Sequence, residues 1–198
     1  MIDYFSKEYN NEKRWMSYWC QIDEILAFNP KKVLVIGKGN GLIPEYLQLR
    51  GLYVKTLDPD KELNPDIAAS VLNIPLDADS FDLALCAEVL EHLPYENFGK
   101  ALSEIKRVAK NGAVISLPHF GPAIRFLFKF PLLPEIKFMI KIPYPKKHQF
   151  KGEHYWEIGK RDYSLGRIKN DIKKSGLSIE SDYIVFENPL HHFFVLKK

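Results

Sequence analysis

Three glycines and one acid stand where two apolar segments end. Gly37, Gly39 and Gly41 follow the apolar run 32–37, and Asp58 ends the next such run. Glycines at a bend let the backbone turn sharply and let a ligand approach without meeting a Cβ. A carboxylate on the neighbouring strand can accept both hydroxyls of a ribose, because its two oxygens match a vicinal diol. The two features favour a nucleoside-containing ligand, although a plain strand-to-helix turn would also explain the glycines.

Such residues meet only if their strands end side by side in one sheet. Apolar runs between turn residues predict strands at 32–37, 52–57, 81–86 and 113–117, with a short one at 67–71. Helices are expected over 42–50, 95–109 and 164–176, and two last strands over 178–186 and 192–196. This alternation predicts an α/β fold: a Rossmann-like, doubly wound, mostly parallel sheet with a C-terminal antiparallel hairpin strand.

The length of 198 residues suits a single domain over 1–198. Residues 1–30 place apolar side chains at helical spacing, which predicts an N-terminal helical cover. A region at 119–163 interrupts the strand–helix alternation and is expected to be an insertion. With only Cys20 and Cys86, no apolar leader and no long apolar run, we expect no disulfide framework and a cytoplasmic protein.

The wider pattern identifies the ligand through a resemblance. The stretch VLVIGKGNG…LDPD…SVLNIPLDADSFDLALCAEVLEHLP…LSEIKRVAKNGAVISLP, residues 33–118, resembles the class I S-adenosylmethionine-dependent methyltransferases, in particular the type 11 small-molecule group. IGKGNG is similar to the glycine-rich first motif of that family. The resemblance implies a single methyltransferase domain with S-adenosyl-L-methionine as its cofactor and a small-molecule or lipid-linked acceptor.

The resemblance also implies roles for residues along the strand ends. The loop would hold the methionine part of the cofactor, Asp58 the ribose, and residues beyond the fourth strand the amino group and sulfonium. The implied cofactor residues are Gly37, Lys38, Gly39, Gly41, Leu57, Asp58, Pro59, Ser70, Val71, Leu72, Cys86, Glu88 and Val89. The chain departs from the family in carrying serine at position 70, where many members have an acid, and in having almost no helix after Asp58.

Histidines supply the candidates for chemistry on the acceptor. An oxygen nucleophile needs a base, and His119, after the strand at 113–117, and His92 could serve as one. A hydrogen-bonded loop histidine and a structural helix-start histidine are the alternatives for the two. The remaining histidines show no spacing typical of metal ligands, so no metal is expected.

The insertion has an unusual composition. Residues 119–151 hold seven basic side chains against one acid, Glu135, together with seven aromatic residues and five prolines. Apolar and basic residues without acids are typical of segments at an anionic membrane surface, so 120–147 could contact a membrane or a lipid-linked acceptor. An ordinary lid over the active site, with solvated lysines, is the alternative.

Three rival functions share some of these features. A nicotinamide-dependent oxidoreductase also uses a glycine loop and a strand-end acid. A non-catalytic module could bind S-adenosylmethionine without methylating anything. Nucleic-acid binding through the basic insertion is disfavoured, because the net charge of the chain is only +3.

Overall fold

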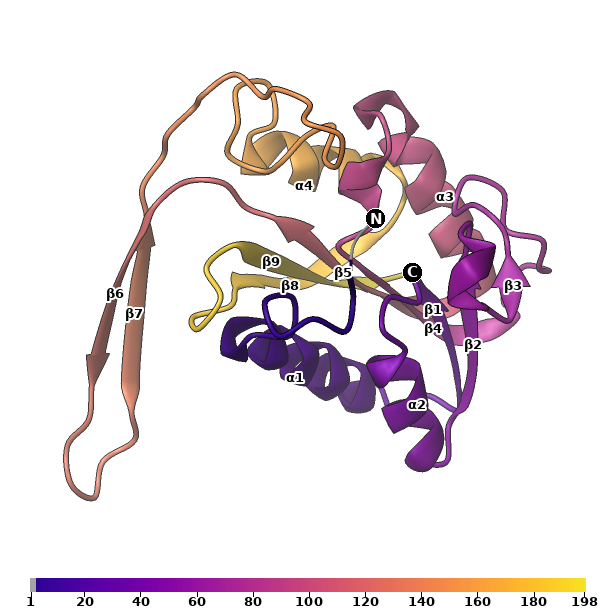
Figure 1. Ribbon diagram of the computed structural model, residues 1–198, viewed down its shortest axis with the longest axis horizontal. Coiled ribbons are helices and arrows are strands. Elements are labelled where there is room, and N and C mark those ends of the chain that lie inside the picture. The colour runs from indigo at the N-terminus through magenta and orange to yellow at the C-terminus, as the bar shows by residue number, and fades with distance from the viewer. Residues whose placement is uncertain (1–2) are drawn as a thin grey trace.

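The computed structural model describes residues 3–198 and is built around one seven-stranded sheet in the order β3-β2-β1-β4-β5-β9-β8 (Figure 1). The strands are β1 (Lys32–Ile36), β2 (Tyr53–Asp58), β3 (Ile67–Ala68), β4 (Phe81–Ala87), β5 (Ala109–Pro118), β8 (Ser178–Ile184) and β9 (His191–Lys197). The first five pair in parallel, and β9 runs antiparallel to both of its neighbours. The predicted doubly wound sheet with a C-terminal antiparallel hairpin strand is therefore confirmed.

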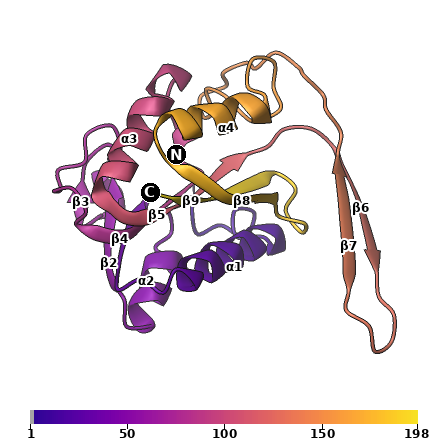
Figure 2. The same cartoon turned by 180° about the vertical axis from the view of Figure 1, so that it is seen from behind.

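Helices cover both faces of this sheet (Figures 1 and 2). On one face lie α1 (Glu12–Ala27) and α2 (Leu42–Leu49), and on the other α3 (Phe98–Val108) and α4 (Leu165–Lys174). Each layer buries a separate apolar cluster, one including Ile25 and Leu47, the other including Leu102 and Ile168. The central strands β1, β4 and β5 are buried on both sides, as their continuous apolar runs predict.

The short elements follow from local capping. The Asn11 side chain accepts from the Arg14 amide and begins α1, and the Ser164 side chain does the same for Arg167 at α4.

The residues after β2 form only the 3-10 turn η1 (Lys61–Leu63), so the expected near-absence of a helix there is found. Further 3-10 turns η2 (Leu90–His92) and η3 (Tyr95–Asn97) precede α3. No helix among residues 3–198 combines the length and apolarity needed to cross a bilayer.

A two-stranded hairpin is the feature that the sequence reading did not contain. Strands β6 (Ala123–Phe128) and β7 (Ile136–Lys141) pair antiparallel and project as an arm away from the body (Figures 1 and 2). The prolines lie just outside the strands, at Pro122, at Pro131 and Pro134 in the tip, and at Pro143 and Pro145. Proline cannot donate to a strand ladder, so its placement outside the paired residues explains how a proline-rich segment still forms two strands.

Candidate functional site

One cavity of about 720 Å³ lies at the carboxyl ends of β1, β2 and β4. Ligands in open α/β sheets bind at this edge, where the strand order reverses. Predicted cofactor and acceptor residues on its wall are Gly37, Lys38, Gly39, Leu57, Asp58, Pro59, Ser70, Val71, Glu88, Val89, His92 and His119. The tertiary structure thus brings together residues from both ends of the predicted site.

The glycine loop has the backbone that only glycine adopts without strain. Gly37, Gly39 and Gly41 have φ angles of 85°, 53° and 80°. A Cβ at Gly37 would meet the Val89 side chain at 2.4 Å, whereas a Cβ at Gly39 would meet no protein atom within 4 Å. Gly39 therefore faces open space inside the cavity, as a loop over which a ligand lies should.

Asp58 is buried and oriented by backbone donors. Its Oδ2 accepts from the Lys38 amide at 2.8 Å and its Oδ1 from the Asp60 amide at 2.9 Å. Each carboxylate oxygen has more than one lone-pair site, so both can still accept from a second donor. The side chain of Asp58 thus links the glycine loop to β2 while it faces the cavity, which fits the predicted clasp of a ribose diol.

The wall beside Asp58 comes from the segment after β3. Ser70 and Val71 line the cavity, and the Ser70 hydroxyl accepts from the Leu72 amide at 3.2 Å. That hydroxyl keeps its proton for donation and a second lone pair for acceptance. The neighbouring loop is fastened by Arg107, whose guanidinium donates to the carbonyls of Ile74 and Leu76 and pairs with Glu104.

Three of the implied cofactor residues lie outside the wall of the cavity that residues 3–198 form. Gly41 caps α2, Leu72 packs against the core cluster under α3, and Cys86 is buried within β4. Burial raises the pKa of the Cys86 thiol well above its ordinary value. Gly41, Leu72 and Cys86 therefore support the glycine loop, the turn after β3 and strand β4, and they do not form the cavity surface.

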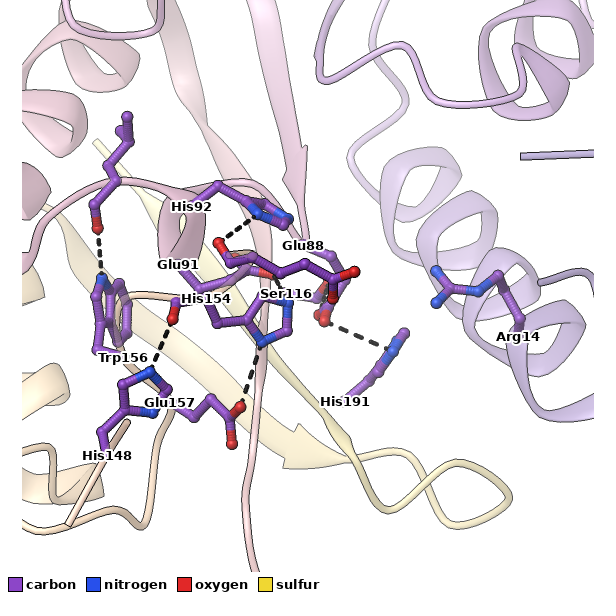
Figure 3. A network of polar contacts seen from close by, with 12 residues as sticks. Arg14, Glu88, Glu91, His92, Ser116, His148, His154, Trp156, Glu157 and His191 are labelled. Carbon is purple, nitrogen blue, oxygen red and sulfur yellow. Dashed lines mark hydrogen bonds and ion pairs between the residues drawn. The ribbon is translucent and has the colours of Figure 1, made fainter. Parts of the chain in front are cut away.

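Glu88 directly follows β4 and has a strained backbone conformation with a φ of 54°. Its Oε1 accepts from the Ser116 hydroxyl at 2.8 Å, and its Oε2 lies 3.6 Å from His191 Nε2 (Figure 3). Strain of this kind persists where surrounding contacts over-determine the conformation. Here the Glu88 amide also donates to the Ser116 carbonyl, so β5 holds the residue at the cavity wall.

His119 belongs to a chain of three side chains. The Asp182 carboxylate lies 2.9 Å from His192 Nε2, and His192 Nδ1 lies 3.0 Å from His119 Nδ1. The carboxylate can only accept, so His192 carries its proton on Nε2, and His119 Nδ1 donates to His192 Nδ1. His119 then presents Nε2 as an acceptor. Burial, with the nearby His192 and Lys141, lowers the pKa of His119 to about 3, so this imidazole is neutral and weakly basic.

The other candidate, His92, lies beside two groups that sequence reasoning did not select. Glu91 and His154 face the same part of the cavity, and the ring centroids of His92 and His154 are 5.0 Å apart (Figure 3). Glu91 is fully buried, and burial followed by the nearby Glu88 raises its pKa well above the ordinary value. Burial likewise lowers the pKa of His92. This part of the cavity wall therefore holds ionisable side chains, Glu91 and His92, whose charged forms are disfavoured by burial.

Comparison with known proteins agrees with this geometry. A family model described as a methyltransferase domain matches residues 34–117. The chain resembles an S-adenosylmethionine-dependent methyltransferase from Mesorhizobium loti, with 17% identity, 96% of this chain and 99% of the other covered, and a TM-score of 0.62. It also resembles an S-adenosylmethionine-dependent methyltransferase from Clostridium acetobutylicum, with 14% identity, 98% and 95% covered, and a TM-score of 0.64.

Residues 34–117 thus match a methyltransferase domain, and the chain shares its fold with the class I S-adenosylmethionine-dependent methyltransferases. The recognition made on the motifs is thus confirmed, and so is S-adenosylmethionine as the cofactor of the family. The nicotinamide alternative shared only the glycine loop and the strand-end acid, and the match over 34–117 includes the fourth and fifth strands as well.

Among curated proteins, the chain matches the ubiquinone biosynthesis O-methyltransferase of Hahella chejuensis with 30% identity over 107 residues, 46% of this chain and 44% of the relative. A 45-residue match to an uncharacterised protein of Methanocaldococcus jannaschii has 49% identity, with 23% of this chain and 19% of the other covered. The chain therefore aligns with less than half the length of the curated relatives it matches.

The cavity is also closed by residues that no local motif indicates. The N-terminal segment and α1 contribute five of them, namely Tyr4, Tyr9, Arg14, Tyr18 and Gln21. The Arg14 guanidinium lies 4.0 Å from the centroid of the Tyr9 ring and points from α1 toward the cavity (Figure 3). The expected cover over 1–30 predicted the place of these residues but not their identity, because helical spacing says only which residues share a face.

Proposed function

We propose that this methyltransferase transfers the methyl group of S-adenosylmethionine to a small, lipid-linked acceptor. The cavity carries the proposal, because it joins the glycine loop and Asp58 to a wall of histidine and glutamate side chains. S-adenosylmethionine supplies a methyl group on a sulfonium, which an acceptor atom takes by in-line displacement while a neutral thioether leaves. The relative from Hahella chejuensis, named as an O-methyltransferase of ubiquinone biosynthesis, favours a small acceptor with an oxygen nucleophile.

The residues of the chain divide into two groups by their part in this reaction. We expect Asp58 and the loop at Gly37 and Gly39 to hold the cofactor, with Ser70 and Val71 beside the adenine. His119 and His92 stay candidates for contact with the acceptor. Because the pKa of His119 is about 3, we expect its Nε2 to orient an acceptor hydroxyl by accepting a hydrogen bond, while proton removal falls to another group.

The hairpin supports the lipid part of the proposal. Residues directly opposite each other on paired strands point to the same face. On one face this rule collects six apolar side chains and no polar one, each between 43% and 56% exposed, namely Ile124, Phe126, Phe128, Ile136, Phe138 and Ile140. The tip adds Phe130, Leu132 and Leu133, all exposed. Soluble surfaces rarely expose an apolar patch of this size without a binding role.

The opposite face of the hairpin attaches it to the body. Arg125 donates to the Phe186 carbonyl at 2.9 Å, and Lys137 pairs with Glu187 at 2.6 Å. Lys141 donates at 2.7 Å to the carbonyls of His119 and Pro189. These basic side chains are therefore used internally, and the cavity wall takes its residues from either side of the hairpin, such as Phe120 and Glu153. The hairpin is thus held outside the cavity as a projecting arm rather than as its cover.

An anionic membrane fits this arm better than a lid role does. Lys129 at the tip, and Lys146 and Lys147 beyond β7, are exposed. Lysines next to exposed aromatic and aliphatic side chains bind anionic headgroups while the apolar groups enter the acyl boundary. We infer that the arm holds the protein, which we expect to be cytoplasmic, at the membrane that contains its acceptor.

Vesicle binding tests this role. We expect the protein to sediment with phosphatidylglycerol-containing vesicles at low salt and much less with neutral vesicles. The double variant Leu132→Ser/Leu133→Ser should weaken vesicle binding at least about tenfold, since each buried leucine contributes about 1.5–3 kcal/mol. Leu49→Ser removes a leucine of similar exposure from α2 and should leave binding unchanged.

Methyl transfer tests the activity itself. Labelled S-adenosylmethionine should transfer its methyl group into the lipid fraction of a cell extract, and calorimetry should show binding of the cofactor. Failure of the wild-type protein to sediment with either vesicle would remove the membrane role. Loss of a dimer in the tip variant would instead identify a second copy of the chain as the occupant of the apolar face. Cofactor binding without transfer to any fraction would favour a non-catalytic module.

A further inference from the structure

Glu91 is a buried carboxyl group whose surroundings are incomplete. Within residues 3–198 neither of its carboxylate oxygens has a hydrogen-bond partner. Its Oε1 lies 3.9 Å from His154 Nε2, beyond hydrogen-bond distance. A desolvated carboxylate without a donor is costly, so the group must carry a proton or have a cation beside it. The side chain faces the cavity, which leaves room for such a cation.

The two neighbouring histidines are oriented as metal ligands usually are. His92 Nδ1 lies 3.0 Å from the Glu153 carbonyl, and His154 Nδ1 lies 3.3 Å from Glu157 Oε1 (Figure 3). The Glu153 carbonyl oxygen accepts, and so does the carboxylate oxygen of Glu157, so each histidine donates its Nδ1 proton to the group behind it. Each ring therefore carries its proton on Nδ1 and a free lone pair on Nε2. Metal-bound histidines are typically fixed in this way by a carbonyl or carboxylate behind them.

The fold holds these groups together although they are far apart in the chain. The Tyr155 amide donates to the Glu91 carbonyl at 2.8 Å, and Trp156 Nε1 donates to the Leu93 carbonyl at 3.0 Å. These two hydrogen bonds hold the segment that follows the hairpin against η2 and against Leu93, the residue after η2. As a result, one ligand atom from each of Glu91, His92 and His154 lies within 4.8 Å of the others.

We propose that Glu91, His92 and His154 bind a divalent transition-metal ion at the acceptor end of the cavity. Two imidazoles and one carboxylate match the preferences of Zn²⁺ and similar ions, whereas Mg²⁺ and Ca²⁺ favour oxygen ligands alone. Ligand bonds of about 2.1 Å require ligand atoms roughly 3–3.5 Å apart, so the side chains close by about 1 Å on binding. The sequence predicted no metal, because histidine spacing alone does not show that His154 lies next to Glu91 and His92 in the folded chain.

The role of this metal site toward the acceptor rests on the proposed function. Three protein ligands leave coordination positions open toward the cavity. An acceptor hydroxyl that binds there loses its proton to solvent more readily, because the cation lowers the pKa of the hydroxyl. The resulting oxygen forms a bond to the methyl carbon as the carbon–sulfur bond breaks. The acceptor class is then an alcohol or phenol, and an amine acceptor would not need the ion.

Calorimetric titration with Zn²⁺ tests the site without any activity assay. We expect one ion to bind per chain, because the three ligand atoms converge on one position. Glu91→Gln keeps the size of the side chain and removes the charge, and it should weaken Zn²⁺ binding at least about 100-fold. Glu157→Gln, behind His154, should weaken it by about 10–100-fold.

Two controls separate this inference from the proposed function. His191→Gln changes a histidine that lines the same cavity but lies outside the set, and it should leave Zn²⁺ binding unchanged. Asp58→Ala should bind Zn²⁺ normally while it loses the cofactor, and Glu91→Gln should bind the cofactor normally. Wild-type protein that binds the cofactor but not Zn²⁺, or Glu91→Gln that binds Zn²⁺ as well as wild type, would overturn the metal site alone. Zn²⁺ binding without cofactor binding would overturn the proposed function instead.

Discussion

The two ends of the cavity are built in different ways. At the cofactor end the ligand would meet mainly backbone and one oriented acid, on a glycine loop and strand ends that lie close together in the sequence. At the acceptor end the wall consists of side chains from five separate segments, including Arg14, Glu91, His119, His154 and His191. A backbone-built site is fixed as soon as the sheet forms, whereas the side-chain wall depends on how the insertion and the N-terminal segment pack. Substitutions should therefore separate the two ends.

The largest effect is expected at the cofactor end. Asp58→Ala should lower the affinity for S-adenosylmethionine by at least about 100-fold, because it removes both acceptors of the ribose diol and the bond to the Lys38 amide. Calorimetry measures the affinity. Asp60→Ala, which only caps η1, is the matched control and should bind normally. Unchanged affinity in Asp58→Ala would break the assignment of this end to the cofactor.

A second effect, on pH dependence, should be confined to the acceptor end. The pKa of His119 is about 3 in the folded protein, below the ordinary histidine value. The unfolded chain therefore binds more protons in this window, so the contribution of His119 is full above about pH 6.5 and falls as the pH drops toward 3. At pH 5 the loss should be about 1–2 kcal/mol.

Denaturant titrations of wild type and His119→Gln measure this slope. We expect the glutamine variant to lose less stability between pH 7 and 5 than wild type does. His148→Gln changes a histidine near the same insertion that lines no part of the cavity, and it should keep the wild-type slope. Parallel curves for wild type and His119→Gln would show that acid sensitivity has another source.

The smallest effect should come from the contacts that hold the adenine-side loop. The hydrogen bond from Arg107 lowers the pKa of Glu104, so the contribution of this carboxylate is present above the unfolded pKa and is lost as the pH falls through the folded value, below about 4.5. Glu104→Gln should cost no more than about 1 kcal/mol at pH 7, since the pair is partly exposed. Thermal unfolding should show a smaller difference from wild type at pH 3.5 than at pH 7.

The sequence could predict much of the fold and the cofactor end. Continuous apolar runs indicated β1, β2, β4 and β5, and capping residues indicated the start of α4. The hairpin was not predicted, because its prolines argue against regular structure and because 124–128 and 136–140 each hold only one polar residue, Arg125 or Lys137, which is too few to show a strand period. The acceptor wall could not be predicted, since local patterns do not say which distant side chains will meet.

The sequence by itself determined the sheet, the glycine bend and the acid beside it, because these follow from short-range steric and periodic constraints. Only the tertiary structure decided that His154 lies beside Glu91 and that Asp182, His192 and His119 form a chain. It also decided that the hairpin of β6 and β7 is attached to the body through one face and exposes apolar side chains on the other. Those arrangements depend on burial and on hydrogen bonds between segments far apart in the chain, and their energies exist only once the chain has packed.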